Sequence, residues 1–211
     1  MTASVPLYIM EPPAGTPPDG GKRIQGGRTM KTVIVFLADG FEECEGLLAV
    51  DLLRRAGVRV ITASVTGRRE VVSSHQVPIT ADELAENADY AAADMLVLPG
   101  GMPGTTHLGE SAVVLDQCRA FAKDKYVAAI CAAPSVLAGL GLLEGKPAAC
   151  HPSVEGKMAG AVLTGKPVET AGNIITGKGL GAAIPFALEL VRVLTDQETA
   201  DRIANAICFA G

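Results

Sequence analysis

Aromatic residues are scarce in this chain, and tryptophan is absent. Only 4% of the 211 residues are aromatic, whereas 48% are hydrophobic and 24 are glycine. That hydrophobic content is ample for the core of one domain, but the core has to be built mainly from small aliphatic side chains. Such side chains favour helices packed on a sheet over an aromatic-rich sandwich, so we expect an α/β architecture.

Further absences narrow the class of protein. The 18 basic residues are scattered and are outnumbered by 23 acidic ones, so nucleic acid is not expected as a partner. No apolar run approaches about 18 residues and the N-terminus lacks the features of a signal peptide, which predicts a cytoplasmic protein without a membrane partner. The five cysteines include no CxxC pair, so neither a disulfide framework nor a zinc site is expected.

Proline and glycine divide the chain into two parts. They interrupt residues 1–30 so often that neither a helix nor a central strand can form there, and we expect a tail. Residues 31–211 are expected to form a single domain.

Strand and helix signals alternate from residue 32 onward. The expected strands are 32–37, 58–64, 94–101, 126–131 and 173–177, and the expected helices are 42–56, 111–123, 133–140 and 181–194. A hairpin is expected at 71–74 and 77–80, with short peripheral strands at 148–151 and 167–170. The main strands are continuously apolar, which is typical of a parallel sheet covered on both faces. We therefore predict a flavodoxin-like, doubly wound, mostly parallel sheet in a three-layer sandwich.

Three loops are expected to meet at one edge of this sheet. Ligands of open parallel sheets bind outside the carboxyl ends of the strands, where the topology switches direction. Residues 38–40, residues 99–101 and Cys131 each follow an expected strand.

Cys131 lies in the segment AAICAAPS, where a strand is expected to turn sharply into a helix. The small residues Ala129 and Ala133 flank it at the two positions that a nucleophile elbow requires. A helix N-terminus would lower the pKa of the thiol and make it a nucleophile. A small buried hydrophobe is the other interpretation, and the segment alone does not decide between them.

Four motifs together resemble a known family. LADGFEECEGLLAVDLLRRAG, LVLPGGMPG, AAICAAPSVLA and CHP are similar, in order and spacing, to the ThiJ/PfpI superfamily, and specifically to its parkinsonism-associated protein deglycase (DJ-1-like) branch. The resemblance covers roughly residues 31–207. It implies a cysteine elbow, no cofactor or metal, and a homodimer packed partly through the helix of residues 43–56.

The resemblance also implies roles for particular residues. Asp39 and Glu42 form a helix-start pattern, and sequence alone does not choose a functional residue among Glu42, Glu43 and Glu45. The resemblance selects Glu45 as a carboxyl group that shares one proton with the Cys131 thiol, raising its own pKa and lowering that of the thiol.

Backbone and imidazole groups complete the implied site. The N–H groups of Gly101 and Ala132 are implied as an oxyanion hole with Gly100 beside them, and His151 as a base or thiolate partner. His75 stands where the family usually carries a basic residue that reaches the partner subunit, and His107 is expected to be solvated.

The implied function is a glyoxalase or protein deglycase that acts on methylglyoxal-type α-oxoaldehydes or glycated proteins. A redox-sensing stress protein or holdase chaperone, with Cys131 oxidised to a sulfinate, is the alternative. A nonenzymatic oligomeric scaffold is a third possibility.

Three other motif interpretations are weaker. GKGLGA, residues 177–182, fits a dinucleotide fingerprint but lacks a later strand with an acidic partner, so we expect a tight turn beside the site. HPSVE does not supply the H-x-E pair of glutamine amidotransferases. The protease-like branch of the superfamily has a histidine directly after the cysteine, where this chain has Ala132, so the deglycase branch fits better.

Overall fold

The computed structural model describes residues 24–25 and 28–210. Most of the predicted tail, residues 1–23 and 26–27, lies outside the described residues. The part of the tail that is described forms a short antiparallel pair, β1 (Ile24–Gln25) with β2 (Arg28–Thr29).

A mostly parallel sheet is the central layer of the fold. Within the described residues it has seven strands in the order β12-β13-β9-β8-β3-β4-β7. Their bounds are Val168–Ala171 for β12, Ile174–Gly177 for β13, Tyr126–Ile130 for β9, Met95–Leu98 for β8, Thr32–Leu37 for β3, Arg59–Ser64 for β4 and Glu83–Leu84 for β7. Every pair is parallel except the edge pair β12 and β13. The predicted doubly wound topology is confirmed.

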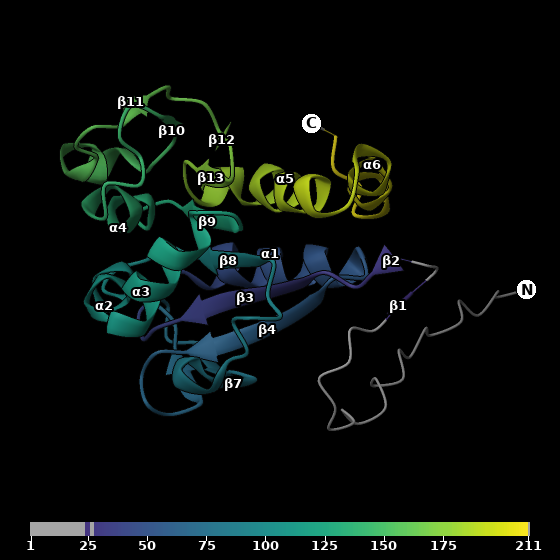
Figure 1. Ribbon diagram of the computed structural model, residues 1–211, viewed down its shortest axis with the longest axis horizontal. Helices are drawn as coiled ribbons and strands as arrows, with labels where there is room; N and C mark the ends of the chain where they lie inside the picture. Colours follow the sequence, from purple (N-terminus) through teal and green to yellow (C-terminus); the bar gives the residue numbers. More distant parts are fainter. Residues whose placement is uncertain (1–23, 26–27, 211) are drawn as a thin grey trace, which may run out of the picture.

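Side chains of the central strands alternate between two cores, as the period of a strand requires. In β3, Ile34 and Phe36 enter one core, and Val33, Val35 and Leu37 enter the other. The first core is covered by α2 (Gly104–Glu110), α3 (Ala112–Phe121) and α4 (Pro134–Gly139). The second is covered by α1 (Glu43–Arg55) and α5 (Ala183–Leu194), with α6 (Gln197–Ala206) packed on α5. In Figure 1, α2, α3 and α4 gather at one side of the sheet, and α5 and α6 lie together near the C-terminus.

Helix α1 begins one residue later than the acidic pattern predicted. Its N-cap is Glu42, whose carboxylate accepts a hydrogen bond from the N–H of Glu45 at 2.6 Å. Asp39 is not part of this cap, because its carboxylate accepts the N–H of Val72 and pairs with Arg68 instead. The apolar residues Ala49, Val50, Leu52 and Leu53 are buried within the chain, while Leu47 is exposed.

Short elements surround the main sheet. The expected hairpin forms from β5 (Glu70–Val72) and β6 (Pro78–Thr80), and β10 (Pro147–Ala148) pairs with β11 (Val162–Leu163). Short 3-10 helices occupy Ala85–Asn87, Pro152–Lys157 and Leu180–Ala182. The strand expected at 94–101 ends at Leu98, because Pro99 cannot donate to a ladder and two glycines follow.

Two helices were not predicted from the sequence. Helix α2 contains two glycines and two threonines and has no apolar period. Helix α6 buries only Ala200 and Ile203, so its apolar face is too small to recognise. None of the helices in the described part of the chain is both long and apolar enough to span a bilayer.

Candidate active site

Cys131 lies at a strained turn between the central strand β9 and helix α4. Its φ angle is +64°, in the left-handed region that non-glycine residues rarely adopt. The turn is held by backbone hydrogen bonds on both sides, from Cys131 N to Gly177 O at 2.9 Å and from His151 N to Cys131 O at 2.8 Å. Ala129 and Ala133 are fully buried beside it. The predicted elbow geometry is therefore present, and the thiol is not simply one more side chain of the sheet.

Gly100 has to lack a side chain for the site to exist. A Cβ at this position would lie 2.5 Å from Cys131 Cβ and 2.5 Å from Glu45 Oε2. Its N–H donates to Glu45 Oε2 at 3.0 Å. Gly100 thus lets the cysteine and the glutamate approach one another across its backbone, and it also orients the carboxyl group.

The structure selects Glu45 from the three glutamates that the sequence left open. Glu45 is 1% exposed, and its carboxyl hydrogen-bonds the Cys131 thiol. The second oxygen, Oε1, is buried and has no partner of good hydrogen-bond geometry within the described residues. A fully ionised carboxylate would be poorly satisfied there, which favours the protonated acid.

Glu42 and Glu43 lie outside this contact, although Glu42 borders it. Glu42 caps α1, and its negative charge contributes to raising the pKa of Glu45. Glu43 instead forms an ion pair with His75, 2.8 Å from its Nδ1. The helix-start role predicted for Glu42 is confirmed, and Glu42 has a second role in the site that the sequence pattern did not indicate.

Two backbone N–H groups point at the sulfur. Those of Gly101 and Ala132 hydrogen-bond Cys131 and act to lower the pKa of its thiol. Gly101 has a φ angle of +89°, and a Cβ there would lie 2.3 Å from the backbone N of Glu42. Glycine is therefore required for this N–H group to face the sulfur. Both groups lie where the resemblance implies an oxyanion hole.

The predicted lowering of the thiol pKa is wrong. Burial, together with the adjacent carboxylate, raises the pKa of Cys131 to about 12, against the opposing effect of the two N–H groups. Burial also raises the pKa of Glu45, from 4.5 to about 7. Helix α4 has only six residues, and its N-terminus does not offset these effects.

The two groups therefore titrate as one pair. The pair releases a first proton near neutral pH and holds the second strongly. When the retained proton is on Glu45, the carboxyl is a donor to sulfur and the charge repulsion, one of the effects that raise the thiol pKa, disappears, while the effect of burial remains. The arrangement can thus hold a thiolate and a carboxylic acid side by side.

His151 reaches the site mainly through its backbone. Its N–H donates to Cys131 O, while Nδ1 of its exposed ring contacts Ser153 Oγ at 2.8 Å. A Cβ built on Gly179 would lie 3.5 Å from His151 Cδ2 and 3.8 Å from Cys131 Sγ. The lack of a side chain at Gly179 thus keeps open the space between the ring and the sulfur.

A cavity of about 590 Å³ opens over the cysteine. Its volume is in the range of small-molecule sites and greatly exceeds what a three-carbon aldehyde needs. The lining residues are Glu42, Glu45, Cys131, His151, Pro152, Gly165, Pro167, Lys178, Gly179, Leu180, Gly181 and Ala182. Residues 178–182 belong to the segment that the sequence predicted as a turn beside the site, and this prediction is confirmed.

The remaining histidines are outside the cavity. His107 is not solvated as expected, because its Nδ1 lies 2.8 Å from the backbone oxygen of Asp39. His75 lies in the loop between β5 and β6 and is largely exposed.

Comparison with known proteins gives consistent matches. The model of the DJ-1/PfpI family matches residues 31–193. Protein dj-1beta of Drosophila melanogaster is 37% identical over 183 residues, 85% of this chain and 98% of that protein. The glutathione-independent glyoxalase DJR-1.2 of Caenorhabditis elegans is 29% identical over 184 residues, 85% of this chain and 97% of that protein. The structure of oxidized Toxoplasma gondii DJ-1 has a TM-score of 0.82 at 34% identity, covering 86% of this chain and 100% of that one.

We expect Gly100→Ala to disrupt the site. The added methyl group would overlap both Cys131 and Glu45, and overpacking of this kind costs about 1–3 kcal/mol. Urea denaturation should show this loss, and alkylation of Cys131, followed by peptide mass, should change in rate. Gly139→Ala in α4 is the control, since a Cβ there would meet no atom within 4 Å apart from its chain neighbours and the backbone of its own helix. An unfolding free energy for Gly100→Ala equal to that of the wild type would contradict the packing described here.

The raised pKa of Glu45 predicts a pH dependence of stability. Between the ordinary value of 4.5 and about 7, the folded chain holds a proton that the unfolded chain has released. Raising the pH through this window should therefore lower the free energy of unfolding, by on the order of 3 kcal/mol for a shift of this size.

The measurement is urea denaturation across this pH window for the wild type and for Glu45→Gln. The variant lacks the titrating group, so its unfolding free energy relative to the wild type should rise with pH. Glu70→Gln, on the exposed end of β5, controls for removal of a charge. Parallel pH profiles for the wild type and Glu45→Gln would show that Glu45 does not hold this proton.

Proposed function

The chain belongs to the DJ-1/PfpI family, and from that premise we propose that it is a cysteine-dependent, cofactor-free glyoxalase or protein deglycase. The substrates we propose are methylglyoxal-type α-oxoaldehydes and their protein adducts. One observation carries the proposal: a thiol at a strained turn contacts a buried carboxyl with a pKa near neutrality, beneath an open cavity. A relative named as a glyoxalase supports the same reaction class.

The first step forms a covalent adduct. The Cys131 thiolate attacks the aldehyde carbon, a C–S bond forms, and the carbonyl π electrons move to oxygen. The N–H groups of Gly101 and Ala132 face the sulfur, so the oxygen on the adjacent carbon develops next to two donors. Glu45 then gives its proton to this oxygen, which yields a hemithioacetal and a Glu45 carboxylate.

The second step moves a hydride equivalent within the substrate by proton transfers. The Glu45 carboxylate removes the proton from the former aldehyde carbon, giving an enediolate, and returns that proton to the neighbouring carbon, while the hydroxyl proton on the first carbon passes to the oxygen of the second. The first carbon is thereby oxidised to a thioester and the second reduced to an alcohol, so no external oxidant is needed. A carboxyl with a pKa of about 7 is suited to both directions of transfer.

Water then releases the product. Hydrolysis of the thioester gives a 2-hydroxy acid, which is lactate when the substrate is methylglyoxal, and restores the thiol. His151 borders the cavity and is our candidate for the base that activates this water. The volume of the cavity also favours an aldehyde carried on a protein side chain as substrate.

A second function is favoured by the same contact. The protonated Glu45 could donate to an oxygen on the sulfur, which would stabilise a sulfinate formed from Cys131 and two equivalents of peroxide. The similarity to a structure of oxidized DJ-1 is consistent with this redox-sensing alternative. Assembly as a homodimer and a cytoplasmic location remain proposals from the sequence.

We expect the wild type to convert methylglyoxal to lactate, followed by NMR. Cys131→Ser should lower kcat by at least about 100-fold, and Glu45→Gln by about 100- to 10,000-fold, the range for one positioned acid or base. Cys208→Ser, at an exposed cysteine, is the matched control and should leave turnover unchanged. Equal turnover in the wild type and Cys131→Ser would rule out the mechanism. A deglycase activity is demonstrated only if the protein releases the adduct from a glycated protein faster than the adduct reverses spontaneously.

The redox alternative predicts oxidation at one cysteine. Mild peroxide should add two oxygen atoms to the peptide that contains Cys131, and Glu45→Gln should slow this addition relative to Cys208→Ser. Intact-protein and peptide masses measure both. Oxidation spread evenly over the exposed cysteines would argue against a sensor at Cys131.

A further inference from the structure

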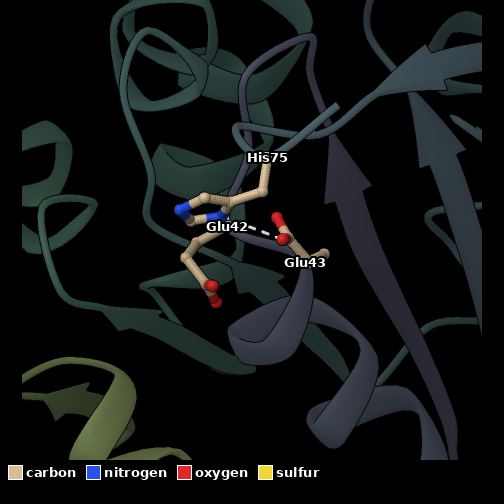
Figure 2. A group of neighbouring side chains, drawn as sticks. All are labelled: Glu42, Glu43 and His75. Atoms are coloured by element: carbon tan, nitrogen blue, oxygen red, sulfur yellow. Dashed lines mark ion pairs between the residues drawn. The ribbon is translucent and has the colours of Figure 1, made fainter. Parts of the chain in front are cut away.

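Three side chains next to the thiol cavity have the spacing of a metal site. Glu42, Glu43 and His75 each offer one ligand atom, and these atoms lie within 4.8 Å of one another. Figure 2 shows the two glutamates at the start of α1, with His75 descending from the loop between β5 and β6. We propose that this cluster binds a divalent transition-metal cation of the zinc type. The proposal does not depend on the glyoxalase or deglycase activity.

Contacts between two separate chain segments hold the donors together. Nδ1 of His75 lies 2.8 Å from Glu43 Oε1, the ion pair drawn as a dashed line in Figure 2. The hydroxyl of Ser74 lies 3.2 Å from the same ring nitrogen and donates to Glu43 Oε2 at 3.4 Å. The backbone N–H of Ser74 donates to Phe41 O at 2.8 Å, which ties this loop to the start of α1.

Burial and charge favour a cation between these donors. Glu42 is 9% exposed, and the Glu43 side chain is 14% exposed. Neither carboxylate forms an ion pair with a lysine or arginine in the described residues, and His75 is the only histidine paired with one of them. The N-terminal amides of α1 offset part of the charge, and the N–H of Glu45 occupies Oε2 of Glu42. The other oxygen of Glu42 makes no hydrogen bond or ion pair within this part of the chain.

The donor set selects the class of cation. One imidazole nitrogen with two carboxylate oxygens suits zinc and similar ions, whereas magnesium and calcium prefer sites built from oxygen alone. Three protein ligands leave a fourth position for water. Ligand atoms around zinc are about 3.3 Å apart at the usual bond lengths, so the donors have to close slightly. Within the single chain the His75 side chain is 69% exposed, so contacts within that chain do not prevent this adjustment.

The cysteine pattern could not have indicated this site. Zinc was not expected from sequence because no two cysteines are spaced as ligands, but here the donors are glutamate and histidine from two segments. Because Glu42 also lines the cavity that contains Cys131, a cation at this cluster would lie at the edge of that cavity.

The test is Zn²⁺ binding to the full chain in a Cys131→Ser background, which removes the competing thiol. Competition with a chromophoric chelator should show one equivalent bound. Adding His75→Gln or Glu43→Gln should weaken binding by at least about tenfold, since even residues outside the coordination shell often cost that much. His107→Gln, at a histidine bonded to Asp39 O, is the matched control and should bind as tightly as the background.

Co²⁺ supplies a spectroscopic signature that does not depend on activity. In the Cys131→Ser background it should give visible d–d absorption without a sulfur-to-cobalt charge-transfer band, and adding His75→Gln should change that absorption. Circular dichroism of each variant verifies folding. The proposal is overturned if Zn²⁺ does not bind, if His75→Gln and Glu43→Gln bind as tightly as the background, or if Mg²⁺ displaces Zn²⁺ at equal concentration.

Discussion

The contact between the Glu45 carboxyl and the Cys131 sulfur is the interaction on which the rest of the site depends. It places one proton between a buried carboxyl and a partly buried thiol, and neither group would have its titration behaviour alone. The contact requires an α1 that carries Glu45 inward, a strand that ends directly before Cys131, and a residue without a side chain, Gly100, between the two groups. The packing of α1 on the sheet therefore sets the chemistry as well as the stability.

The backbone contributes as much as the side chains. Cys131 keeps its unfavourable φ angle because hydrogen bonds to Gly177 and from His151 fix both of its peptide groups. Gly101 keeps a positive φ angle so that its N–H faces the sulfur. Strain at such positions persists only where the surrounding structure imposes it, and here parallel strands with fixed register do so. The sheet thus acts as a frame that holds groups in arrangements they would not adopt in isolation.

The fold was largely predictable because apolar strands and helices alternate clearly from residue 32. Helices α2 and α6 escaped prediction because one has no apolar period and the other buries only two side chains. The position of Cys131 at a turn and the convergence of the strand ends could also be predicted from the sequence. The choice of Glu45 over its acidic neighbours required the family resemblance. The pKa of the thiol was not predictable: the short α4 suggested a lowered value, but burial of the sulfur and the carboxyl beside it raise the pKa, and both are properties of the tertiary structure.

Most of the wall of the cavity comes from parts of the chain that supply neither the thiol, the carboxyl nor the two N–H donors. Residues 178–182, with Gly165 and Pro167, border the opening, whereas the thiol, the carboxyl and the two N–H donors come from β9, α1 and the loop after β8. Selectivity and reactivity are consequently encoded separately. Substitutions in the wall can therefore change which carbonyl compounds enter the cavity without changing the thiol, the carboxyl or the N–H donors. The same separation would allow the entrance to be redesigned while these reacting groups are kept.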